Sequence, residues 1–129
     1  MMKFDDNQPI YQQIVGWIQE KILRQEWTEQ ERIPSVRELG AMLEVNPNTV
    51  MRSYEKLQAQ QVIYNRRGIG YFVGTDAGRI IRAEQRTAFM EADLPRLFER
   101  MELLGIGIGE IDSQYNQYRL KSVKDENKQ

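Results

Sequence analysis

Residues 33–50 of the chain, IPSVRELGAMLEVNPNTV, contain two helix-start signals in close succession. Ser35 and Glu38 have the spacing of a capping box, in which each side chain bonds the backbone N–H of the other residue. Asn46 is a good N-cap residue, and Pro47 after it fits the first turn of a helix. The segment therefore predicts two short helices joined by about three residues, which is a helix-turn-helix.

The flanking residues predict one more helix and a β-hairpin. Before the segment, isoleucine recurs at every fourth position: Ile10, Ile14, Ile18 and Ile22. Such a period is typical of the buried face of an amphipathic helix, and the polar run Thr28–Arg32 that ends it predicts a loop. After the segment, β-branched or aromatic runs at 62–64 and 71–73 flank a stretch with two arginines and two glycines. This pattern predicts a hairpin with a basic tip.

The rest of the chain predicts helices with an unpartnered apolar face. Thr75 or Asp76 can cap one helix, and Asp93 with Pro95 can open another. The apolar positions of this region are Ile80, Leu94, Leu97, Phe98, Met101 and Leu104. Because roughly fifty helical residues cannot bury both of their faces alone, we expect these side chains to form a dimer interface rather than the wall of a ligand pocket.

A glycine-rich stretch separates the last two predicted helices. Residues 105–109, GIGIG, invite a nucleotide-binding interpretation, but they follow an amphipathic helix, lack the third glycine spacing and have no lysine after them. We interpret the stretch as a helix end and a connector. A last short helix is expected from Glu110 to about Lys121, with residues 122–129 frayed.

Composition disfavours several classes of function. The 129 residues include no cysteine and no histidine, so disulfides, zinc or haem sites and nucleophile-histidine mechanisms are not expected. With no apolar run of bilayer length and no secretory signal, we expect a cytoplasmic protein with no cofactor, metal or membrane partner. The net charge is −1, but residues 32–75 carry six basic side chains against three acidic ones, which gives +3. A basic middle suits contact with nucleic acid.

Together these motifs resemble the GntR family of bacterial regulators, and the short C-terminal region resembles its YtrA-like subgroup. The resemblance extends over about residues 9–73. It rests on PIYQQI at 9–14, IPSVREL at 33–39, VNPNTV at 45–50, RSYEKL at 52–57 and RGIGYFV at 67–73. Four positions depart from the usual pattern: Gln25, Gln30 and Gln61 replace expected glycines, and Gly40 stands where alanine is common.

The resemblance implies an α+β fold, with an N-terminal winged helix-turn-helix of three helices plus a β-hairpin wing, followed by a short α-helical dimerisation segment. We expect the DNA-binding domain at residues 1–75, the dimerisation segment at 76–121 and a flexible tail at 122–129. If Gln61 ends the third helix in a left-handed conformation, it carries a cost on the order of 1 kcal/mol that glycine would avoid.

In that family the winged helix-turn-helix binds double-stranded DNA, and the helix that starts at Asn46 is the candidate recognition helix. A helix-turn-helix inserts the start of this helix into the major groove, where asparagine can pair with adenine and the Thr49 methyl can meet a thymine methyl. The resemblance also places the counterpart of Arg37 against DNA. The expected DNA contacts are Ser35, Arg37, Asn46, Asn48, Thr49, Arg52, Arg66, Arg67, Gly68 and Gly70.

Each of these residues also has a plainer interpretation. Asn46 can be only a cap, and the hairpin glycines can merely satisfy turn geometry. Arg37 and Arg52 can be surface arginines paired with acidic neighbours, namely Glu38, Glu44 or Glu55.

The leading hypothesis is a sequence-specific transcription regulator, a repressor, that binds a pseudo-palindromic operator as a homodimer. The competing hypothesis is a winged-helix protein-interaction module without DNA binding. An enzyme is the least favoured class, because the clustered Asp and Glu residues are more simply solvated faces. A small-molecule effector would have to bind at the dimer interface or near residues 76–86.

Overall fold

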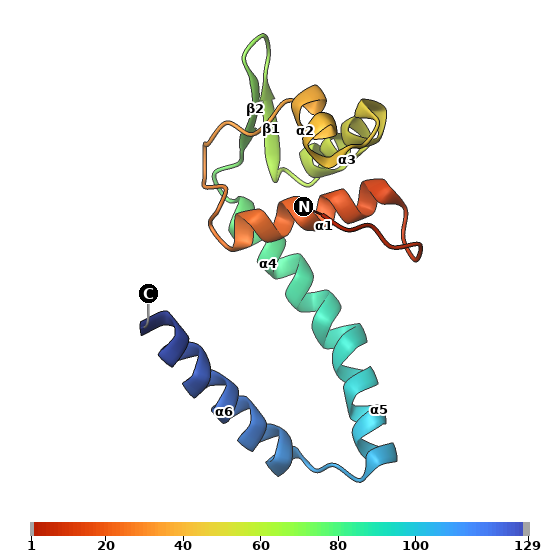
Figure 1. Cartoon of the computed structure of the whole chain (residues 1–129), viewed down its shortest axis with the longest axis vertical. Coiled ribbons are helices and arrows are strands. Elements are labelled where there is room, and N and C mark those ends of the chain that lie inside the picture. Colours follow the sequence, from red (N-terminus) through yellow and green to blue (C-terminus); the bar gives the residue numbers. More distant parts are fainter. Residues whose placement is uncertain (1, 128–129) are drawn as a thin grey trace. The chain divides into compact units, whose positions relative to one another are not determined.

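The chain divides into two compact units, Met1–Arg86 and Thr87–Gln129, of which the computed structural model describes residues 2–127 (Figure 1). The first unit contains α1 (Ile10–Leu23), α2 (Val36–Leu43), α3 (Pro47–Ala59), β1 (Ile63–Arg66), β2 (Gly70–Val73) and most of α4 (Ala77–Ala88). Three helices followed by an antiparallel hairpin confirm the predicted α+β winged helix-turn-helix.

The core of the first unit lies where α1, α3 and the hairpin meet. Its buried side chains include Ile14, Ile18, Leu39, Val50, Leu57, Val62, Val73 and Ile81. Removing each such aliphatic side chain from water contributes about 1.5–3 kcal/mol. Ile10 is the exception to the predicted isoleucine stripe, since it is the first residue of α1 and stays exposed.

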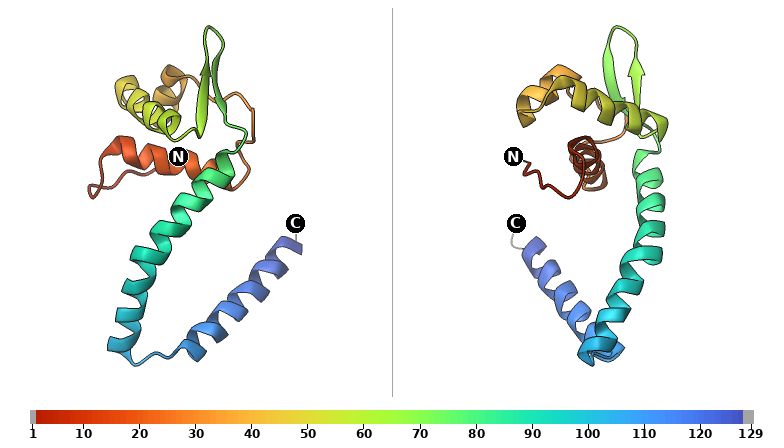
Figure 2. Two further views of the ribbon diagram at one scale, coloured as in Figure 1. Left: turned by 180° about the vertical axis from the view of Figure 1, so that it is seen from behind. Right: turned by 90° about the vertical axis from the view of Figure 1, so that its right-hand side faces the viewer.

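The hairpin pairs β1 with β2 in a register that sets Tyr64 opposite Phe72 and Arg66 opposite Gly70. It extends beyond α2 and α3, as Figure 2 shows from two further sides. Tyr71 holds the inner face of the hairpin to α3, because its ring packs edge-on against Tyr54 and its hydroxyl donates to the Met51 sulfur at 3.9 Å.

The polar run before α2 contains no helix or strand, as the predicted loop requires, but its last residues bond to β2. Arg32 forms an antiparallel bridge with Phe72, the Val73 N–H donates to Glu31 O at 3.0 Å, and the Gln30 N–H donates to Val73 O at 2.8 Å. The Ile33 side chain next to them is buried. The end of this run therefore lies beside β2. Its position depends on a bonding partner about forty residues away in sequence.

The three glutamines at expected glycine positions all adopt left-handed backbone conformations. Their φ angles are 61° at Gln25, 64° at Gln30 and 63° at Gln61. Glu44, which ends α2, has φ 56°. Gly40 is needed in the same turn, because a Cβ there would lie only 2.9 Å from the Val45 carbonyl oxygen. At four positions the fold therefore requires a left-handed backbone, which favours glycine, although a residue with a long side chain stands there.

The second unit contains η1 (Phe89–Asp93), α5 (Leu94–Leu104) and α6 (Ile108–Asn127). η1 is a π-helical segment that follows α4 directly in the chain. α5 begins at Leu94 with Pro95 in its first turn, as predicted, but Asp93 makes no capping hydrogen bond and has helical backbone angles, so the chain is helical on both sides of this start. The connector is also shorter than expected, because α6 begins before Glu110.

α6 also continues beyond the expected end near Lys121. Residues 122–127 are helical rather than frayed. The last two residues of the expected tail lie outside the described residues. Within residues 2–127, no helix is long and apolar enough to span a lipid bilayer.

Replacing Gln61 with glycine should stabilise the first unit. The Gln61→Gly variant relieves a left-handed backbone that costs a β-carbon-bearing residue about 1 kcal/mol, partly offset by the greater freedom of glycine in the unfolded chain. We expect the free energy of unfolding to rise by roughly 0.5–1 kcal/mol, measured by urea denaturation at fixed protein concentration. The matched control is Gln58→Gly, inside α3, which should destabilise by a similar amount. Two changes of the same sign would contradict this explanation.

Candidate nucleic-acid interface

The starts of α2 and α3 are held by the side chains that the sequence pattern singles out. Around Ser35, the Glu38 N–H donates to the serine Oγ and the Ser35 N–H donates to the Glu38 Oε1, both at 3.1 Å. At the start of α3, the Asn48 N–H donates to the Asn46 Oδ1 at 2.8 Å. Both predicted helix starts are therefore confirmed.

These bonds leave donors free at both helix starts. The Ser35 hydroxyl hydrogen and the Asn46 side-chain NH₂ are not used in capping, since both caps employ only the oxygen as an acceptor. The free backbone N–H groups of each first turn also carry the positive end of a helix dipole. Each helix start thus presents donors of the kind that bind phosphate.

The two helix starts and β2 border one open depression of about 580 Å³. Its lining residues are Ser35, Val36, Arg37, Asn46, Pro47, Asn48, Met51 and Tyr71. Four predicted DNA-contact residues are therefore brought together by the fold from two different helices. Asn48 is exposed and Thr49 half-buried, on the first turn of α3 beside this depression.

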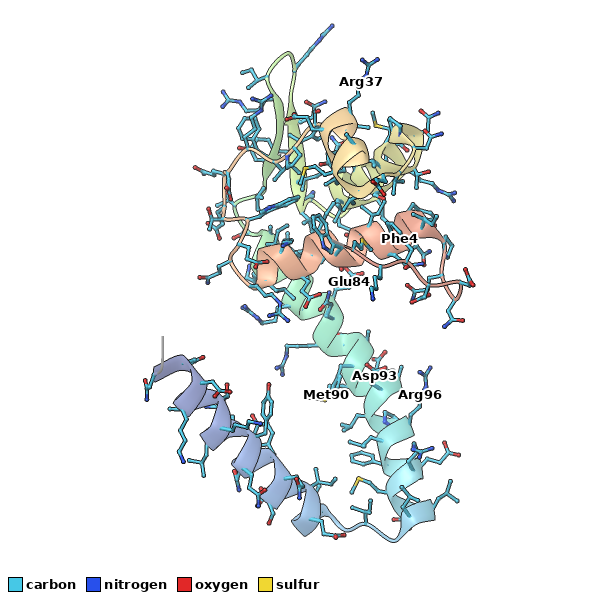
Figure 3. All side chains as sticks on the ribbon, in the orientation of Figure 1. Phe4, Arg37, Glu84, Met90, Asp93 and Arg96 are labelled. Atoms are coloured by element: carbon cyan, nitrogen blue, oxygen red, sulfur yellow. The ribbon has the colours of Figure 1, made fainter. Side chains whose placement is uncertain are left out.

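Arg37 is exposed on α2, and Figure 3 shows its side chain pointing away from the core into solvent. Within residues 2–127 it forms no ion pair, so the expected alternative of pairing with Glu38, Glu44 or Glu55 is not observed. Its charge is free to meet a ligand.

Arg52 is held by an aromatic ring rather than by a carboxylate. Its guanidinium lies 3.9 Å from the centroid of the Tyr11 ring, a cation–π contact between α3 and α1. The pKa of Tyr11 is lowered, first by the hydrogen bond that the Gln12 amide donates to its hydroxyl, with the charges of Arg52 and Lys56 acting in the same direction. Tyr11 and Lys56 were missed as site residues, because α1 and α3 meet only in the folded chain.

The hairpin carries the other predicted cations. Arg66 lies over Phe72 at 5.6 Å from the ring centroid, and Tyr64 stacks on the same ring at 5.6 Å and 19°. Arg67 and Gly68 are exposed at the tip, where Gly68 has φ 78°. Gly70 has φ 145° and lies close to the Arg32 side chain.

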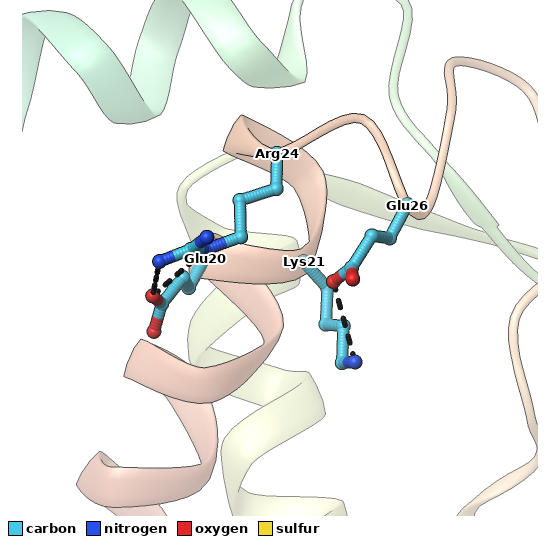
Figure 4. Close-up of polar contacts among 4 residues, drawn as sticks. All are labelled: Glu20, Lys21, Arg24 and Glu26. Atoms are coloured by element: carbon cyan, nitrogen blue, oxygen red, sulfur yellow. Dashed lines mark hydrogen bonds and ion pairs between the residues drawn. The ribbon is translucent and has the colours of Figure 1, made fainter. Parts of the chain in front are cut away.

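The end of α1 shows a different use of charge (Figure 4). Arg24 is 2.8 Å from Glu20, and Lys21 is 3.3 Å from Glu26, so these cations have anionic partners of their own. The arginines of α2, α3 and the hairpin have none among residues 2–127. The arginines beside the two helix starts and in the hairpin are therefore unpaired, although unpaired cations such as Arg82 also occur elsewhere within residues 2–127.

The residues expected at a dimer interface belong to α4 and α5. Ile80, on α4, packs partly against the core of the first unit. In the second unit Met101 is buried, Leu94 is half-buried, and Leu97, Phe98 and Leu104 are exposed. Within residues 2–127, no group of three or more His, Cys, Asp or Glu residues could hold a metal ion.

Residues 10–73 match the family model described as bacterial regulatory proteins of the gntR family. The chain is 36% identical over 75 residues to the uncharacterized HTH-type transcriptional regulator YhcF of Bacillus subtilis, covering 58% of this chain and 62% of YhcF. It is 30% identical over 96 residues to the HTH-type transcriptional repressor YtrA of the same organism, covering 74% of this chain and 68% of YtrA. The match thus spans less than two thirds of YhcF and just over two thirds of YtrA.

Solved structures are similar over more of the chain. A GntR-family transcriptional regulator from Bacteroides thetaiotaomicron is 42% identical with a TM-score of 0.73, over 88% of this chain and 99% of that one. The DNA-binding domain of AraR, solved in complex with operator ORR3, shares the fold at 24% identity and a TM-score of 0.52, over 57% of this chain and 89% of that one.

The capping box of α2 should weaken in acid. The hydrogen bond that the Ser35 N–H donates to its carboxylate is the largest cause that lowers the pKa of Glu38 below its ordinary value of 4.5. A carboxyl whose pKa is lowered by folding stabilises the fold above its unfolded pKa, and this contribution is lost as the pH falls through the folded pKa. The difference in unfolding free energy between the wild type and Glu38→Gln should therefore be constant above about pH 5.5 and shrink below pH 4.5.

The control for this experiment is Glu55→Gln, which alters an exposed carboxylate on α3 with no hydrogen bond or ion pair within residues 2–127. Urea denaturation at a series of pH values measures both differences. If the Glu38→Gln and Glu55→Gln differences follow the same course with pH, the charged capping box contributes nothing.

Proposed function

The chain belongs to the GntR family of bacterial regulatory proteins and is related to YtrA, and from this premise we propose that it is a cytoplasmic repressor that binds a pseudo-palindromic operator as a homodimer. Residues 10–73 are the DNA-binding domain of a GntR transcriptional regulator. The relatives are transcriptional regulators, and the proposed activity needs no enzymatic step, cofactor or metal.

The observation that carries the proposal is the meeting of two helix starts and the hairpin at one surface with unpaired arginines. In a winged helix-turn-helix bound to DNA, the second helix of the motif enters the major groove and the wing lies beside it. α3 and the β1–β2 hairpin have this arrangement in the first unit (Figure 1). The AraR domain, which shares the fold, was solved in complex with its operator.

Individual roles follow from the chemistry of each side chain. Asn48 and Thr49, on the first turn of α3, would meet base edges in the major groove. Arg37 on α2 offers a forked guanidinium for a phosphate or a guanine. Ser35 and Asn46 would bind phosphate through the donors that their caps leave free. Arg66, Arg67, Gly68 and Gly70 would form the part of the wing that contacts the minor groove or backbone.

A homodimer accounts for the apolar side chains of the second unit. Among the described residues of this unit, only the apolar side chain of Met101 is buried. Phe98 is 47% exposed, Leu97 41% and Leu104 61%. Large apolar side chains gathered along one helix usually mark a protein interface. A second copy would cover them and present two recognition helices to two half-sites about one DNA turn apart, or a multiple of it.

Binding of DNA should be tight, selective and sensitive to salt. We would titrate labelled DNA from upstream of the gene, and a scrambled duplex, at two salt concentrations and follow fluorescence anisotropy. Arg37→Ala should weaken binding to the upstream duplex by roughly 5- to 100-fold. Arg24→Ala, which removes a cation already paired with Glu20, should leave binding nearly unchanged. Equal and weak binding of both duplexes by the wild type would instead favour a protein-interaction module without DNA binding.

Dimerisation should depend on the exposed apolar face of α5. Phe98→Glu places a charge in the proposed interface, where burial of an unpaired carboxylate is costly, so sedimentation velocity at micromolar concentration should show monomers. Leu103→Glu is the matched control, since Leu103 is 79% exposed on the same helix and outside the proposed face. A dimeric Phe98→Glu variant, or a monomeric wild type, would rule out this interface.

A further inference from the structure

Arg32 is a cation that lies against the wing although it comes from the segment before α2. Its backbone pairs with Phe72 in an antiparallel bridge, so its side chain shares the sheet face of Phe72 and of Tyr64, the Phe72 partner on β1. The orange segment that enters α2 in Figure 1 is the one that runs beside β2.

The Arg32 side chain extends toward the tip of the hairpin. A Cβ added at Gly70 would lie 2.9 Å from the Arg32 Nε and 3.5 Å from its Nη2, so the guanidinium lies over the Gly70 backbone. Gly70 is two residues nearer the tip than Phe72, which is about 7 Å along a strand. The missing side chain of Gly70 therefore provides the space in which the guanidinium of Arg32 rests.

No carboxylate forms an ion pair with this group within residues 2–127, and Arg32 is exposed. Its charge acts only at longer range on Glu38, where it helps to lower the pKa of that carboxyl. Arg66 on β1 pairs with Gly70 on β2. The guanidinium of Arg66 lies over Phe72, which is also on β2. Two like charges beside one strand repel each other unless an anion lies between or in front of them.

The position of Arg32 along the chain makes it a link between the two parts of the proposed DNA surface. Three residues after it comes Ser35, at the start of α2, and its guanidinium lies at Gly70, near the wing tip. Arg32 therefore precedes α2, which carries Arg37, and its guanidinium lies on the hairpin, which carries Arg66 and Arg67. A cation at this position suits the backbone of a DNA strand that passes from the major groove to the wing.

We propose that Arg32 is a DNA-phosphate contact of this regulator, and that Gly70 is the positioning residue that lets its guanidinium lie along the wing. The inference rests on the proposed DNA-binding function and extends it to a residue outside the recognition helix and the hairpin. Gly70 then acts mainly by seating Arg32, rather than by bringing its own backbone close to DNA. Because a phosphate contact carries no sequence information, it contributes equally to both duplexes.

The test is the salt dependence of binding by full-length protein, measured by anisotropy with labelled upstream duplex over several salt concentrations. Each phosphate contact contributes about 0.9 to the slope of log Kd against log salt. Arg32→Ala should lower that slope by about 0.9 and weaken binding several-fold at low salt, whereas Arg32→Lys should keep the slope. The control is Arg82→Ala, which removes an exposed, unpaired cation on α4 and should change nothing.

The role of Gly70 is tested by a double-mutant cycle. Because alanine at φ 145° also strains the wing backbone, the cycle compares salt slopes and not affinities. Gly70→Ala should lower the slope as Arg32→Ala does, and the double variant should have the slope of Arg32→Ala alone, because both changes remove the same contact. Additive losses would overturn the seating role. An Arg32→Ala slope equal to that of the wild type, with Arg37→Ala still impaired, would overturn the inference while leaving DNA binding intact. No preference of the wild type for the upstream duplex would instead overturn the proposed function itself.

Discussion

The buried hydroxyl of Tyr54 joins the three parts of the first unit that form the proposed interface. It donates to the Pro34 carbonyl oxygen at 2.6 Å, and its ring packs edge-on against Tyr71 at 4.8 Å. Tyr54 belongs to α3, Pro34 precedes the start of α2, and Tyr71 lies on β2. Because burial raises the pKa of Tyr54 above its usual value, the hydroxyl remains protonated and a donor at neutral pH. The side chain of Tyr54 thus contacts both the segment before α2 and the wing, and links each of them to α3.

Features that depend on neighbours in sequence were predictable. The capping box at Ser35 and the cap at Asn46 are each properties of a few consecutive residues, and both are present. The left-handed turn at Gln61 is also present, but it was expected from the family resemblance and not from the neighbouring residues. Features that depend on distant partners were not. The bridge of Arg32 with Phe72 and the stacking of Arg52 on Tyr11 join residues about forty positions apart, and neither residue type announces its partner. The length of α6 was missed for another reason, since a polar helix has no apolar period to mark its end.

Three of the arginines near the proposed interface are supported without being neutralised. Arg52 lies on Tyr11, Arg66 on Phe72, and Arg32 on the backbone of Gly70. An aromatic ring or a bare backbone restrains a guanidinium but leaves its N–H groups and its charge available, whereas a carboxylate would occupy both. A restrained arginine loses less side-chain entropy when it meets a phosphate. This explains how a chain with a net charge of −1 can present a surface suited to an anion.

One copy of the protein has few such cations, so DNA affinity should depend on dimerisation. The proposed DNA surface therefore depends on the apolar face of α5, through which two copies would pair. Counterion release grows with the number of phosphates contacted, so one copy of the protein with a handful of arginines has only modest affinity for DNA. Joining two copies in a dimer makes the second DNA contact intramolecular and raises overall affinity without any new contact. The exposed Leu97 and Phe98 would then contribute to DNA affinity although they touch no DNA. By linkage, operator DNA that binds both copies at once must in turn stabilise the dimer.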